Sequence, residues 1–478
     1  MRARRLSELV DLMQPAAVEL VGDDLMAGPD VVLDNRLATP GSVFVAIPGA
    51  RVDGHSFAPQ AVEAGSAAVL GNHVTEADVP HLLVADTVEG LSWLGRGVVR
   101  EARARGLVSL GITGSSGKTS TKDLLAQVLE QAGPAVVPSG SQNNEIGVPL
   151  TACRVTDETR FLVSEMGSRG RGHIAWLTSL VGLDIGVVLN VGAAHVGEFG
   201  GLEQTAVAKS EIIAGLGSGG WAVLNADDAA CRAMRGATSA RVAWFGEADP
   251  PPDGDLHVRA TDVHGNALAQ CSFTLHVTHQ GQTSTHAVSL QVVGRHQVSN
   301  ALAAAAAAVA AGVEPGAVAS ALSRAMARSS WRMELTRGSS DQIILNDAYN
   351  ANPDSMAAAL RTTADLIRAQ REVHGGARSI AVLGDMLELG EDAQRLHAQL
   401  GALAGELGID EVVGVGDYAE VVASAARQNR ASSRVATRDE AADIELGPGD
   451  VLLVKGSRGI GLELVAEAVA VRSKGEQQ

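Results

Sequence analysis

The sequence predicts an α/β protein of three domains, in which the second and third are doubly wound parallel sheets. Two observations support this prediction. The chain has 478 residues, and a single domain typically holds about 100–200 residues. From residue 107 onward, short apolar runs rich in β-branched residues alternate with helical patterns and end in small or polar residues, as buried parallel strands do. The predicted domains are residues 1–104, 105–327 and 328–478.

The first predicted domain is a small α/β unit. Short strands are expected in VVLDNR (31–36) and GSVFVAIPG (41–49), where β-branched and aromatic residues are bounded by turn residues. The stretch HSFAPQAVEAGSAAVL (55–70) predicts a helix followed by a strand. We therefore expect a compact domain with few and short strands.

The second and third predicted domains repeat a strand–loop–helix pattern. In the second, ATPase-like domain, buried strands are expected in LVSLGIT, FLVSEMG, DIGVVLNVG and WAVLNADD. Residues 250–293 differ, because the turn signal PPPDGD precedes two β-rich runs, and they predict a β-rich insertion before a helix that begins near Val298. In the third, Rossmann-like domain, strands are expected in QIILNDAYN, SIAVLGDM, EVVGVGDY and DVLLVKGSRG.

Composition and charge exclude several classes of protein. The formal net charge of −17 argues against a nucleic-acid-binding protein, which normally presents a basic face. The three cysteines are odd in number and widely spaced, which fits a reduced cytosolic compartment without disulfides or a zinc motif. No apolar run reaches the roughly 18 residues of a membrane span, and the Ala-rich run 301–311 is expected to be a buried helix. We expect a cytoplasmic protein, with a monomer as the default state.

A Gly- and Ser-rich loop follows the first strand of the second domain and opens a helix. Its residues are Thr113, Gly114, Ser115, Ser116, Gly117, Lys118 and Thr119. The strict P-loop pattern would place glycine at residue 112, which is Ile112, yet Gly114 and Gly117 still allow the backbone to wrap a phosphate. Lys118 supplies a cation for the outer phosphates, and the Thr119 hydroxyl can bind Mg²⁺. The alternative is an ordinary Gly/Ser turn.

Two further polar residues follow predicted strands of the same sheet. Glu165 ends FLVSE, and His195 comes shortly after DIGVVLNVG. Open parallel sheets bind ligands outside the carboxyl ends of their strands, so we expect Glu165 and His195 to lie near Lys118 and Thr119. Glu165 offers hard oxygen atoms for Mg²⁺, and His195 is a supplementary ligand. The alternatives are a carboxylate that caps a helix and a histidine in an exposed loop.

Lysine is scarce in this chain. Its five lysines are Lys118, Lys122, Lys209, Lys455 and Lys474. A lysine that persists where arginine dominates suggests a need for an amine, although chance explains Lys122 and Lys474 equally well. Lys209 lies in a helical stretch, where a solvated side chain is the default expectation. The pair Asn143 and Asn144 lies in a turn, where asparagines usually have a structural role.

These motifs together resemble the Mur ligase family, whose members join amino acids to a nucleotide-linked muramoyl peptide at the expense of ATP. The loop T-G-S-S-G-K-T is similar to the family's phosphate loop, which explains why residue 112 is not glycine. The resemblance covers nearly the whole chain, and its motifs stand in the family's order. The other motifs are NNEIGVPL, SEMGSRGRGHIAWL, NVGAAHVGEFGG, AKSEI, LNADD, GRHQVSNALAA, WRMEL, NDAYNANPDSM, LGDMLELG and KGSRG.

The resemblance implies ATP, two Mg²⁺ sites and a carbamylated lysine as cofactors. The implied catalytic residues are Lys118, His195, Lys209 and Arg332. The implied metal ligands are Thr119, Glu165, His195 and Lys209. Lys209 would take up CO₂ to become an anionic carbamate, which an arginine could not do. Residues 113–119 and Arg332 would bind the phosphates, Asn300 the adenine and Asp347 the ribose.

The resemblance also implies substrate-binding residues at both ends of the chain. The first domain is similar to the family's uridine-binding domain, and Asp34, Asn35 and Arg36 match its motif, with Asn35 where Ser or Thr is usual. Six more residues are implied to orient substrate, with a structural role as the alternative. They are Asn143, Asn144, Asp385, Glu388, Lys455 and Arg458.

The motifs DAYNANPDSM and GDMLELG are similar to the family member that adds the dipeptide D-alanyl-D-alanine, and the D-N-P-R motif of the member that adds lysine or diaminopimelate is absent. The implied substrates are therefore a UDP-muramoyl tripeptide and D-Ala-D-Ala. ATP would convert the tripeptide carboxylate into an acyl phosphate inside a cleft that closes by a large domain motion. The alternatives are a sister ligase that adds a single amino acid and an ATP-binding switch protein, which would need no second metal site.

Overall fold

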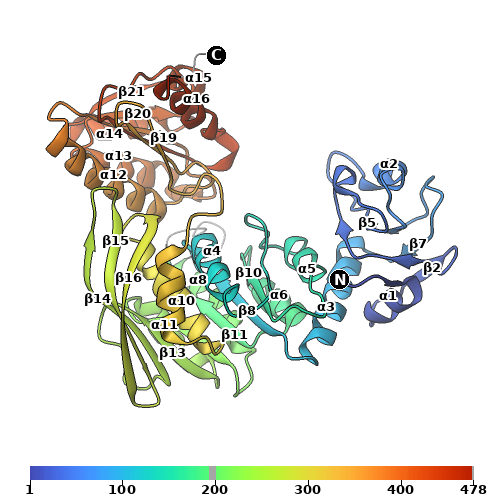
Figure 1. The fold of residues 1–478 in the computed structure, drawn as a ribbon. Helices are drawn as coiled ribbons and strands as arrows, with labels where there is room; N and C mark the ends of the chain where they lie inside the picture. The colour runs from blue at the N-terminus through green and yellow to red at the C-terminus, as the bar shows by residue number, and fades with distance from the viewer. Residues whose placement is uncertain (193–200, 476–478) are drawn as a thin grey trace.

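The computed structural model describes residues 1–192 and 201–475 and arranges them as three α/β units (Figure 1). Each unit is built around its own sheet, which confirms the predicted fold class. His195, predicted as a catalytic residue and metal ligand, lies outside the described residues. Within the described residues, no helix is both long and apolar enough to span a bilayer.

The N-terminal unit contains a five-stranded sheet in which β2 runs antiparallel to its neighbour and the other strands are parallel. The strand order is β2 (Glu19–Val21), β7 (His81–Leu83), β6 (Ala68–Gly71), β5 (Val43–Val45) and β4 (Val31–Val32). A separate pair joins β1 (Arg4–Arg5) to β3 (Met26–Ala27). The helices are α1 (Leu6–Leu12), α2 (Ala58–Glu63) and α3 (Thr87–Arg103). The small α/β unit predicted for this region is therefore present.

The central unit contains a nine-stranded sheet with β8 near its middle. Its order is β16 (Gln282–Val293), β15 (Gln270–His279), β14 (Leu256–Gly265), β13 (Arg241–Gly246), β12 (Trp221–Asn225), β11 (Ile185–Val188), β8 (Val108–Thr113), β10 (Phe161–Glu165) and β9 (Ala135–Val136). After β8 the chain adds strands on one side and then crosses to add β11 on the other. Such a reversal of strand order is where open α/β sheets bind ligands.

The predicted β-rich insertion is a continuation of this sheet. The strands β14, β15 and β16 extend it beyond β13, with β14 parallel to β13 and the last two strands antiparallel. The two predicted β-rich runs correspond to β15 and β16. The strand β14 was not predicted, because its polar residues alternate with apolar ones on a half-exposed face. The sheet is therefore mixed, with its parallel half around the phosphate loop.

Helices cover both faces of the central sheet. One face packs against α4 (Lys118–Leu129), α10 (Gln297–Ala310) and α11 (Pro315–Arg324). The Ala-rich part of α10 is fully buried, as predicted, and small side chains let α10 lie against α4. The other face packs against α5 (Gly147–Ala152), α6 (His173–Val181), α8 (Leu202–Ala214) and α9 (Ala229–Ala233). This second core continues without interruption through α3 into the N-terminal unit.

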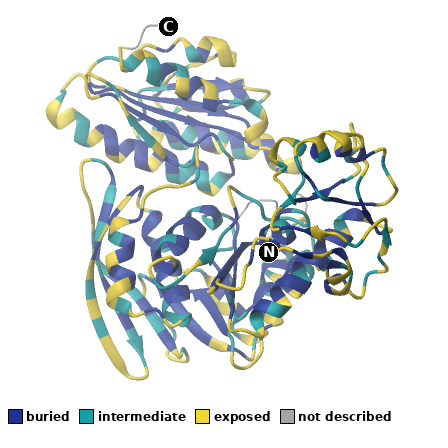
Figure 2. Ribbon diagram, turned by 45° about the vertical axis from the view of Figure 1, so that its right-hand side comes forward, coloured by how far each residue is buried: buried dark blue, intermediate teal, exposed yellow. Residues whose placement is uncertain are grey.

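The C-terminal unit is a doubly wound, six-stranded sheet in which β17 alone is antiparallel. Its order is β17 (Glu334–Arg337), β18 (Ile343–Asn346), β22 (Val451–Lys455), β19 (Ser379–Gly384), β20 (Glu411–Val415) and β21 (Ser432–Val435). Its helices are α12 (Pro353–Val373), α13 (Ala393–Glu406), α14 (Ala419–Gln428), α15 (Arg438–Ala442) and α16 (Glu463–Ser473). Two separate apolar cores cover its faces, and its buried strands stand out in Figure 2. The Rossmann-like pattern of alternating strands and helices is thus confirmed.

Candidate active site

A cavity of about 520 Å³ lies between the central and C-terminal units. The ends of β8 and β10 in one sheet and of β18 and β22 in the other sheet lead into residues of its wall. Fourteen predicted site residues line it: Ser115, Ser116, Gly117, Lys118, Thr119, Asn143, Asn144, Glu165, Lys209, Asn300, Arg332, Asp347, Glu388 and Lys455. The cavity therefore unites residues that are more than 300 positions apart in the chain.

The Gly/Ser-rich loop is held in a fixed shape at the start of α4. Gly117 caps the helix with φ of +80°, and a side chain there would overlap the Asn300 amide oxygen. The Ser116 N–H donates to Asn190 Oδ1 over 3.0 Å. Lys118 Nζ turns back over the loop and donates to the Gly114 carbonyl oxygen over 2.7 Å. Burial lowers the pKa of Lys118, and the nearby Glu165 carboxylate opposes this. The loop thus presents N–H groups and an amine to the cavity.

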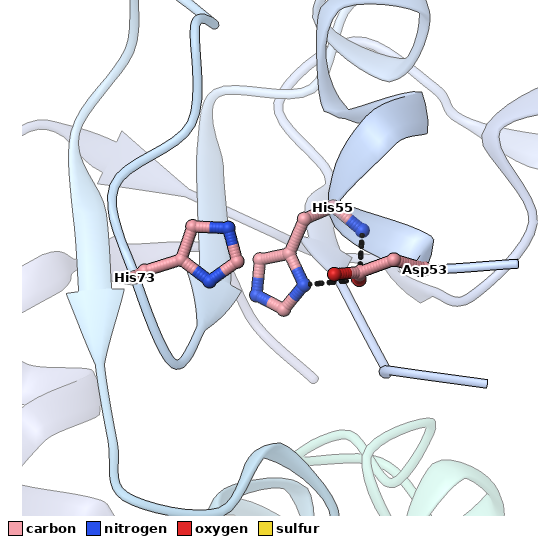
Figure 3. Close-up of side chains that lie close together, drawn as sticks. All are labelled: Asp53, His55 and His73. Carbon is pink, nitrogen blue, oxygen red and sulfur yellow. Dashed lines mark hydrogen bonds and ion pairs between the residues drawn. The ribbon is translucent and has the colours of Figure 1, made fainter. Parts of the chain in front are cut away.

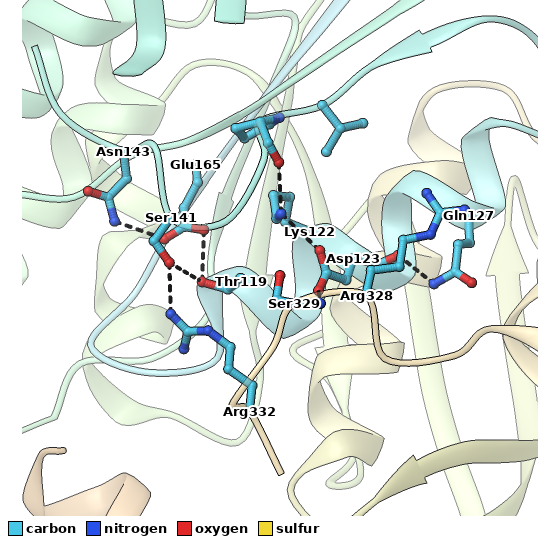
Figure 4. A network of polar contacts seen from close by, with 12 residues as sticks. Thr119, Lys122, Asp123, Gln127, Ser141, Asn143, Glu165, Arg328, Ser329 and Arg332 are labelled. Atoms are coloured by element: carbon cyan, nitrogen blue, oxygen red, sulfur yellow. Dashed lines mark hydrogen bonds and ion pairs between the residues drawn. The ribbon is translucent and has the colours of Figure 1, made fainter. Parts of the chain in front are cut away.

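A chain of polar contacts joins the loop to the C-terminal unit (Figure 4). Glu165 is 1% exposed and accepts hydrogen bonds from Thr119 Oγ1 and Asn143 Nδ2, each over 2.9 Å. Ser141 Oγ lies 3.0 Å from Thr119 Oγ1 and accepts a hydrogen bond from Arg332 Nη2 over 2.7 Å. The carboxylate, hydroxyl and amide oxygens gathered here are the hard donors that Mg²⁺ prefers.

Lys209 lies in the wall of the cavity. The default expectation of a solvated helical lysine is wrong, because Lys209 on α8 is 4% exposed and faces the cavity. Burial, reinforced by the positive charge of Lys118, lowers the pKa of Lys209 to about 7. A lysine of this kind is substantially uncharged at neutral pH, and a neutral amine is a nucleophile.

The C-terminal wall of the cavity contains a buried ion pair. Lys455 is 2% exposed, and its amine donates to Asp347 Oδ2 over 2.6 Å and to the Asn350 carbonyl oxygen over 2.8 Å. Asp347 also accepts a hydrogen bond from the Met333 N–H over 3.1 Å. Burial lowers the pKa of Lys455, whereas Asp347 acts in the opposite direction. The pair therefore fixes the end of β22 against the segment that enters the C-terminal unit.

Two asparagines in the cavity wall also have structural partners. The Asn144 side-chain oxygen accepts the N–H groups of Ile146 and Gly147 at the start of α5. Asn300 is buried and bonds to Thr121 and Gln297. These contacts hold both side chains in place beside the cavity, as ligand-binding residues require.

Seven predicted residues within the described part of the chain do not line this cavity. Asp385 is buried and accepts the N–H groups of Asp417 and Tyr418. Arg458 pairs with Glu463 and stacks over the Trp331 ring at 4.0 Å. Asp34, Asn35 and Arg36 lie in the N-terminal unit, and Thr113 and Gly114 are buried and do not line the cavity.

Several residues of the cavity wall escaped the sequence analysis. They are Ser141, His173, His296, Tyr349, Asn352 and Asp354. Burial lowers the pKa of His296 to about 4, so this side chain is neutral. Asn352 caps α12 through the Ser355 N–H, and its amide lies 3.5 Å from the Ser115 carbonyl oxygen. The Asn-Pro-x-Ser sequence signals the helix cap, but nothing local signals the contact with the phosphate loop.

A group of side chains of metal-ligand type lies in the N-terminal unit (Figure 3). The rings of His55 and His73 stack with centroids 4.0 Å apart and planes inclined by 22°. Imidazoles bind an ion in the ring plane, so nearly parallel rings cannot share one. His55 is also fully engaged, with Nδ1 2.6 Å from Asp53 Oδ1 and Nε2 accepting the Asn72 N–H. This group stabilises the turn before α2.

Family models match the chain in three consecutive segments. The Mur ligase family catalytic domain matches residues 31–107, the Mur ligase middle domain residues 112–308, and the Mur ligase glutamate ligase domain residues 331–458. This chain belongs to the Mur ligase family. The phosphate loop, Glu165 and Lys209 lie within the match to the middle domain, and Asp347 and Lys455 lie within the third.

Curated relatives of this Mur ligase match over nearly its whole length. The UDP-N-acetylmuramoyl-tripeptide–D-alanyl-D-alanine ligase of Mycobacterium tuberculosis is 41% identical, with 92% of this chain and 91% of the relative covered. The Escherichia coli enzyme of the same name is 34% identical over 97% of this chain and 98% of its own.

Solved structures of Mur ligases have the same architecture. MurF from Acinetobacter baumannii superimposes with a TM-score of 0.82 at 28% identity, covering 98% of this chain and 99% of that one. MurF from Thermotoga maritima in complex with ADP superimposes with a TM-score of 0.73 at 26% identity, covering 94% of this chain and 98% of that one. A UDP-N-acetylmuramoyl-L-alanyl-D-glutamate–2,6-diaminopimelate ligase superimposes with a TM-score of 0.51 at 18% identity, covering 98% of this chain and 99% of that one. This match shows a shared fold alone.

Proposed function

We propose that this Mur ligase joins D-alanyl-D-alanine to UDP-N-acetylmuramoyl-tripeptide, with cleavage of ATP to ADP and phosphate. The observation that carries the proposal is the shared cavity, in which the phosphate loop of the central unit faces Arg332, Asp347 and Lys455. The names of the relatives, which match over nearly the whole chain, supply the substrates. ATP and UDP-linked precursors place the reaction in the cytoplasm.

The reaction has to activate a carboxylate. A tripeptide carboxylate oxygen attacks the γ-phosphorus of ATP, the bond to the bridging oxygen breaks, and ADP leaves. The acyl phosphate has a good leaving group, so the amine of D-Ala-D-Ala attacks its carbonyl carbon. Phosphate then leaves, the peptide bond remains, and one proton is released. Two anions approach each other in the first step, so charge neutralisation and alignment are the main catalytic tasks.

The cations around the cavity suit these tasks. Lys118 at the loop and Arg332 on the opposite wall would bind the phosphates together with the N–H groups at the start of α4. Asn300 would contact the adenine. Asp347 would bind the ribose with the acceptor capacity that its bonds to Lys455 and Met333 leave free.

The donor set beside the loop fits Mg²⁺, which would supply positive charge at the phosphates. Thr119 and Glu165 would hold the first ion. Lys209 would serve the second site, because its neutral amine can add to CO₂, form an N–C bond and release a proton to give a carbamate. We also propose His195, which lies outside the described residues, as a ligand of this second site.

The other predicted residues remain proposals for substrate binding. Asp34 and Arg36 would hold the uridine, with Asn35 beside them, and Asn143, Asn144, Glu388 and Lys455 would contact the peptide end. Asp385 and Arg458 lie outside the cavity wall, so a direct contact would require a domain movement. We propose that the units close during the reaction, because an acyl phosphate must be shielded from water.

A phosphate-release assay tests this function. The protein is given ATP, Mg²⁺ and UDP-muramoyl tripeptide, with D-Ala-D-Ala or with single amino acids as the acceptor. Release that requires D-Ala-D-Ala, with a pentapeptide product in the mass spectrum, is expected. Release with single amino acids only identifies a sister ligase, and ATP cleavage without an acceptor favours a switch protein. Lysine and diaminopimelate tripeptides are compared in parallel.

A further inference from the structure

The segment that joins the central unit to the C-terminal unit lies along α4 (Figure 4). We call residues 326–332 the linker. Asp123 and Gln127 on α4 and Glu130 at its C-cap recur at spacings of four and three residues, so their side chains lie along one face of the helix. We call these three residues the α4 stripe. Each of them binds the linker.

Two members of the stripe bind the main chain of the linker. Gln127 Nε2 donates to the Met326 carbonyl oxygen over 2.8 Å, and its Oε1 accepts the Met326 N–H over 3.0 Å. Asp123 Oδ2 accepts the Ser329 N–H over 3.0 Å, and its Oδ1 pairs with the buried Lys122 amine at 2.8 Å. Because these contacts reach backbone atoms of the linker, they fix its register against the helix independently of the linker's own side chains.

The third member forms a paired contact at the far end of α4. Glu130 accepts two hydrogen bonds of 2.6 Å from the guanidinium of Arg328. The linker then runs back toward the start of the helix, where Arg332 donates to Ser141 beside Thr119. One rigid helix therefore carries the phosphate loop at its start and the linker contacts along its length.

The linker borders a second cavity, of about 260 Å³, with Leu124 of α4 and Val292 of β16 in its wall. Residues 326–328 and 330 of the linker are exposed and none of its residues is fully buried, so the linker gains little from packing. Its position therefore depends on the polar contacts with the α4 stripe.

The end of the linker is a strained turn that presents Arg332. Trp331 and Met333 flank it with φ of +58° and +51°, a region that large side chains rarely adopt. Their N–H groups donate to Glu334 and Asp347. The Arg332 guanidinium stacks over the Tyr349 ring at 4.2 Å and points to the phosphate loop. Small shifts of the linker would therefore move this cation.

We infer that the α4 stripe is a positioning device, which holds the linker in register so that Arg332 meets the terminal phosphates of a nucleoside triphosphate bound at the start of the same helix. The inference rests on the proposed function only in taking the ligand to be a nucleotide. Asp123, Gln127 and Glu130 act through Arg332, and they do not touch the ligand.

A double-mutant cycle on nucleotide binding tests the inference, with Gln127→Ala, Arg332→Ala and the combined variant. Calorimetric titration with ADP and with a non-hydrolysable ATP analogue, both with Mg²⁺, measures affinity. Gln127→Ala should weaken binding of the ATP analogue about tenfold, as expected for two lost hydrogen bonds. In the Arg332→Ala background, Gln127→Ala should weaken binding of the ATP analogue by less than about twofold.

The control is Gln399→Ala on α13, which removes an exposed glutamine that bonds only to Arg395 among the described residues. It should leave the affinity and Tm unchanged. Additive effects of Gln127→Ala and Arg332→Ala, or no effect of either, would overturn the inference. Because binding is measured without the acceptor, a protein that lacks ligase activity but shows the expected cycle would contradict the proposed function alone.

A second pair of variants decides the matter if Gln127→Ala does not fold. Arg328→Ala should weaken binding of the ATP analogue about threefold. The exchange Glu130→Arg with Arg328→Glu should restore it, since the paired contact is rebuilt with reversed charges. Failure of the exchange to restore affinity, in a protein with an unchanged Tm, would contradict the inference.

Discussion

The central unit and the N-terminal unit hold their charged predicted site residues in opposite ways. In the central unit, Glu165 and Lys209 are buried, and Glu165 is bonded to side chains from separate segments of the chain. In the N-terminal unit, Asp34 and Arg36 pair with each other across 2.6 Å, and the Arg36 side chain is 82% exposed. The Arg36 guanidinium and N–H lower the pKa of Asp34 to about 2.

This difference indicates two kinds of binding. Where charges are buried, the fold has already removed water and fixed the groups, so each one is expected to act strongly on a bound phosphate. Where charges are exposed, water and salt screen them, and their contribution to binding is smaller. Substitutions in the two regions should therefore differ in size and in the kinetic constant they change.

The largest effect is expected from Lys118→Ala. Removing the amine above the phosphate loop takes away a cation from a buried site, which should lower kcat by about 10³-fold. Phosphate release under saturating substrates measures this effect. The exposed Lys474 provides the matched control, because Lys474→Ala should leave kcat and Tm unchanged. A comparable loss in both variants would remove the distinction between buried and exposed charge.

Lys209→Arg should lower kcat by about 10–100-fold. A guanidinium keeps the positive charge but cannot add to CO₂. Activity of the native protein should fall in buffer depleted of bicarbonate, and the variant should not respond. If both proteins respond equally, Lys209 does not carry the carbamate.

The pH dependence of stability gives an independent measurement on the same lysine. The pKa of Lys209 is lowered to about 7 in the folded chain from 10.5. Between these values the unfolded chain holds a proton that the folded chain has lost, so the free energy of unfolding should rise with pH through this window. Lys209→Met should show a smaller rise in urea denaturation from pH 7 to 10, with the remainder due to the other buried lysines, Lys118 and Lys455. A similar slope in both proteins would contradict the burial of the amine.

Arg36→Ala should have a smaller effect and a different signature. It removes one exposed cation from the predicted uridine site, which should raise KM for the UDP-linked substrate by about tenfold. Because the side chain is exposed, kcat and Tm should stay the same. Steady-state kinetics with varied UDP-muramoyl tripeptide measures this. A loss of kcat with unchanged KM would contradict this prediction, because that result is expected for the buried charges of the central unit.

The smallest effect on activity is expected from Asp385→Ala. Asp385 holds the N–H groups of Asp417 and Tyr418, so the substitution should lower the free energy of unfolding by about 1–3 kcal/mol. KM and kcat should change less than about threefold. Chemical denaturation and steady-state kinetics separate the two results, and a large rise in KM for D-Ala-D-Ala would restore the predicted role in substrate orientation.

Local sequence patterns predicted the features of this fold that depend on short segments. The strands before Gly114 and Glu165, and the loop that opens α4, follow from apolar runs that end in small or polar residues. Their convergence follows from a general property of parallel sheets. The sequence therefore predicted that Lys118, Thr119, Glu165 and His195 lie close together. The first three line one cavity, and His195 lies outside the described residues.

Features that depend on contacts between distant segments were not predictable in this way. The face of α8 that carries Lys209 is buried by neighbouring elements, and the helical pattern does not reveal which face this is. Ser141 contacts Thr119 and also Arg332, which lies 191 residues further along the chain than Ser141, and no local motif encodes the second contact. Asp385 was predicted to orient substrate, but its carboxylate accepts hydrogen bonds from two backbone N–H groups in the fold.

The apolar core that runs from the N-terminal sheet through α3 onto the central sheet has a consequence for how the molecule can be divided. Cutting the chain after residue 104 would expose apolar surface on both fragments. We therefore expect neither fragment to remain soluble by itself. Among the described residues, three side chains from the central unit, Leu268, Ala269 and Val293, pack into the apolar cores of the C-terminal unit. We therefore expect the C-terminal unit to be the part that can be excised, expressed alone or exchanged between relatives, and the part that moves if the units close as proposed.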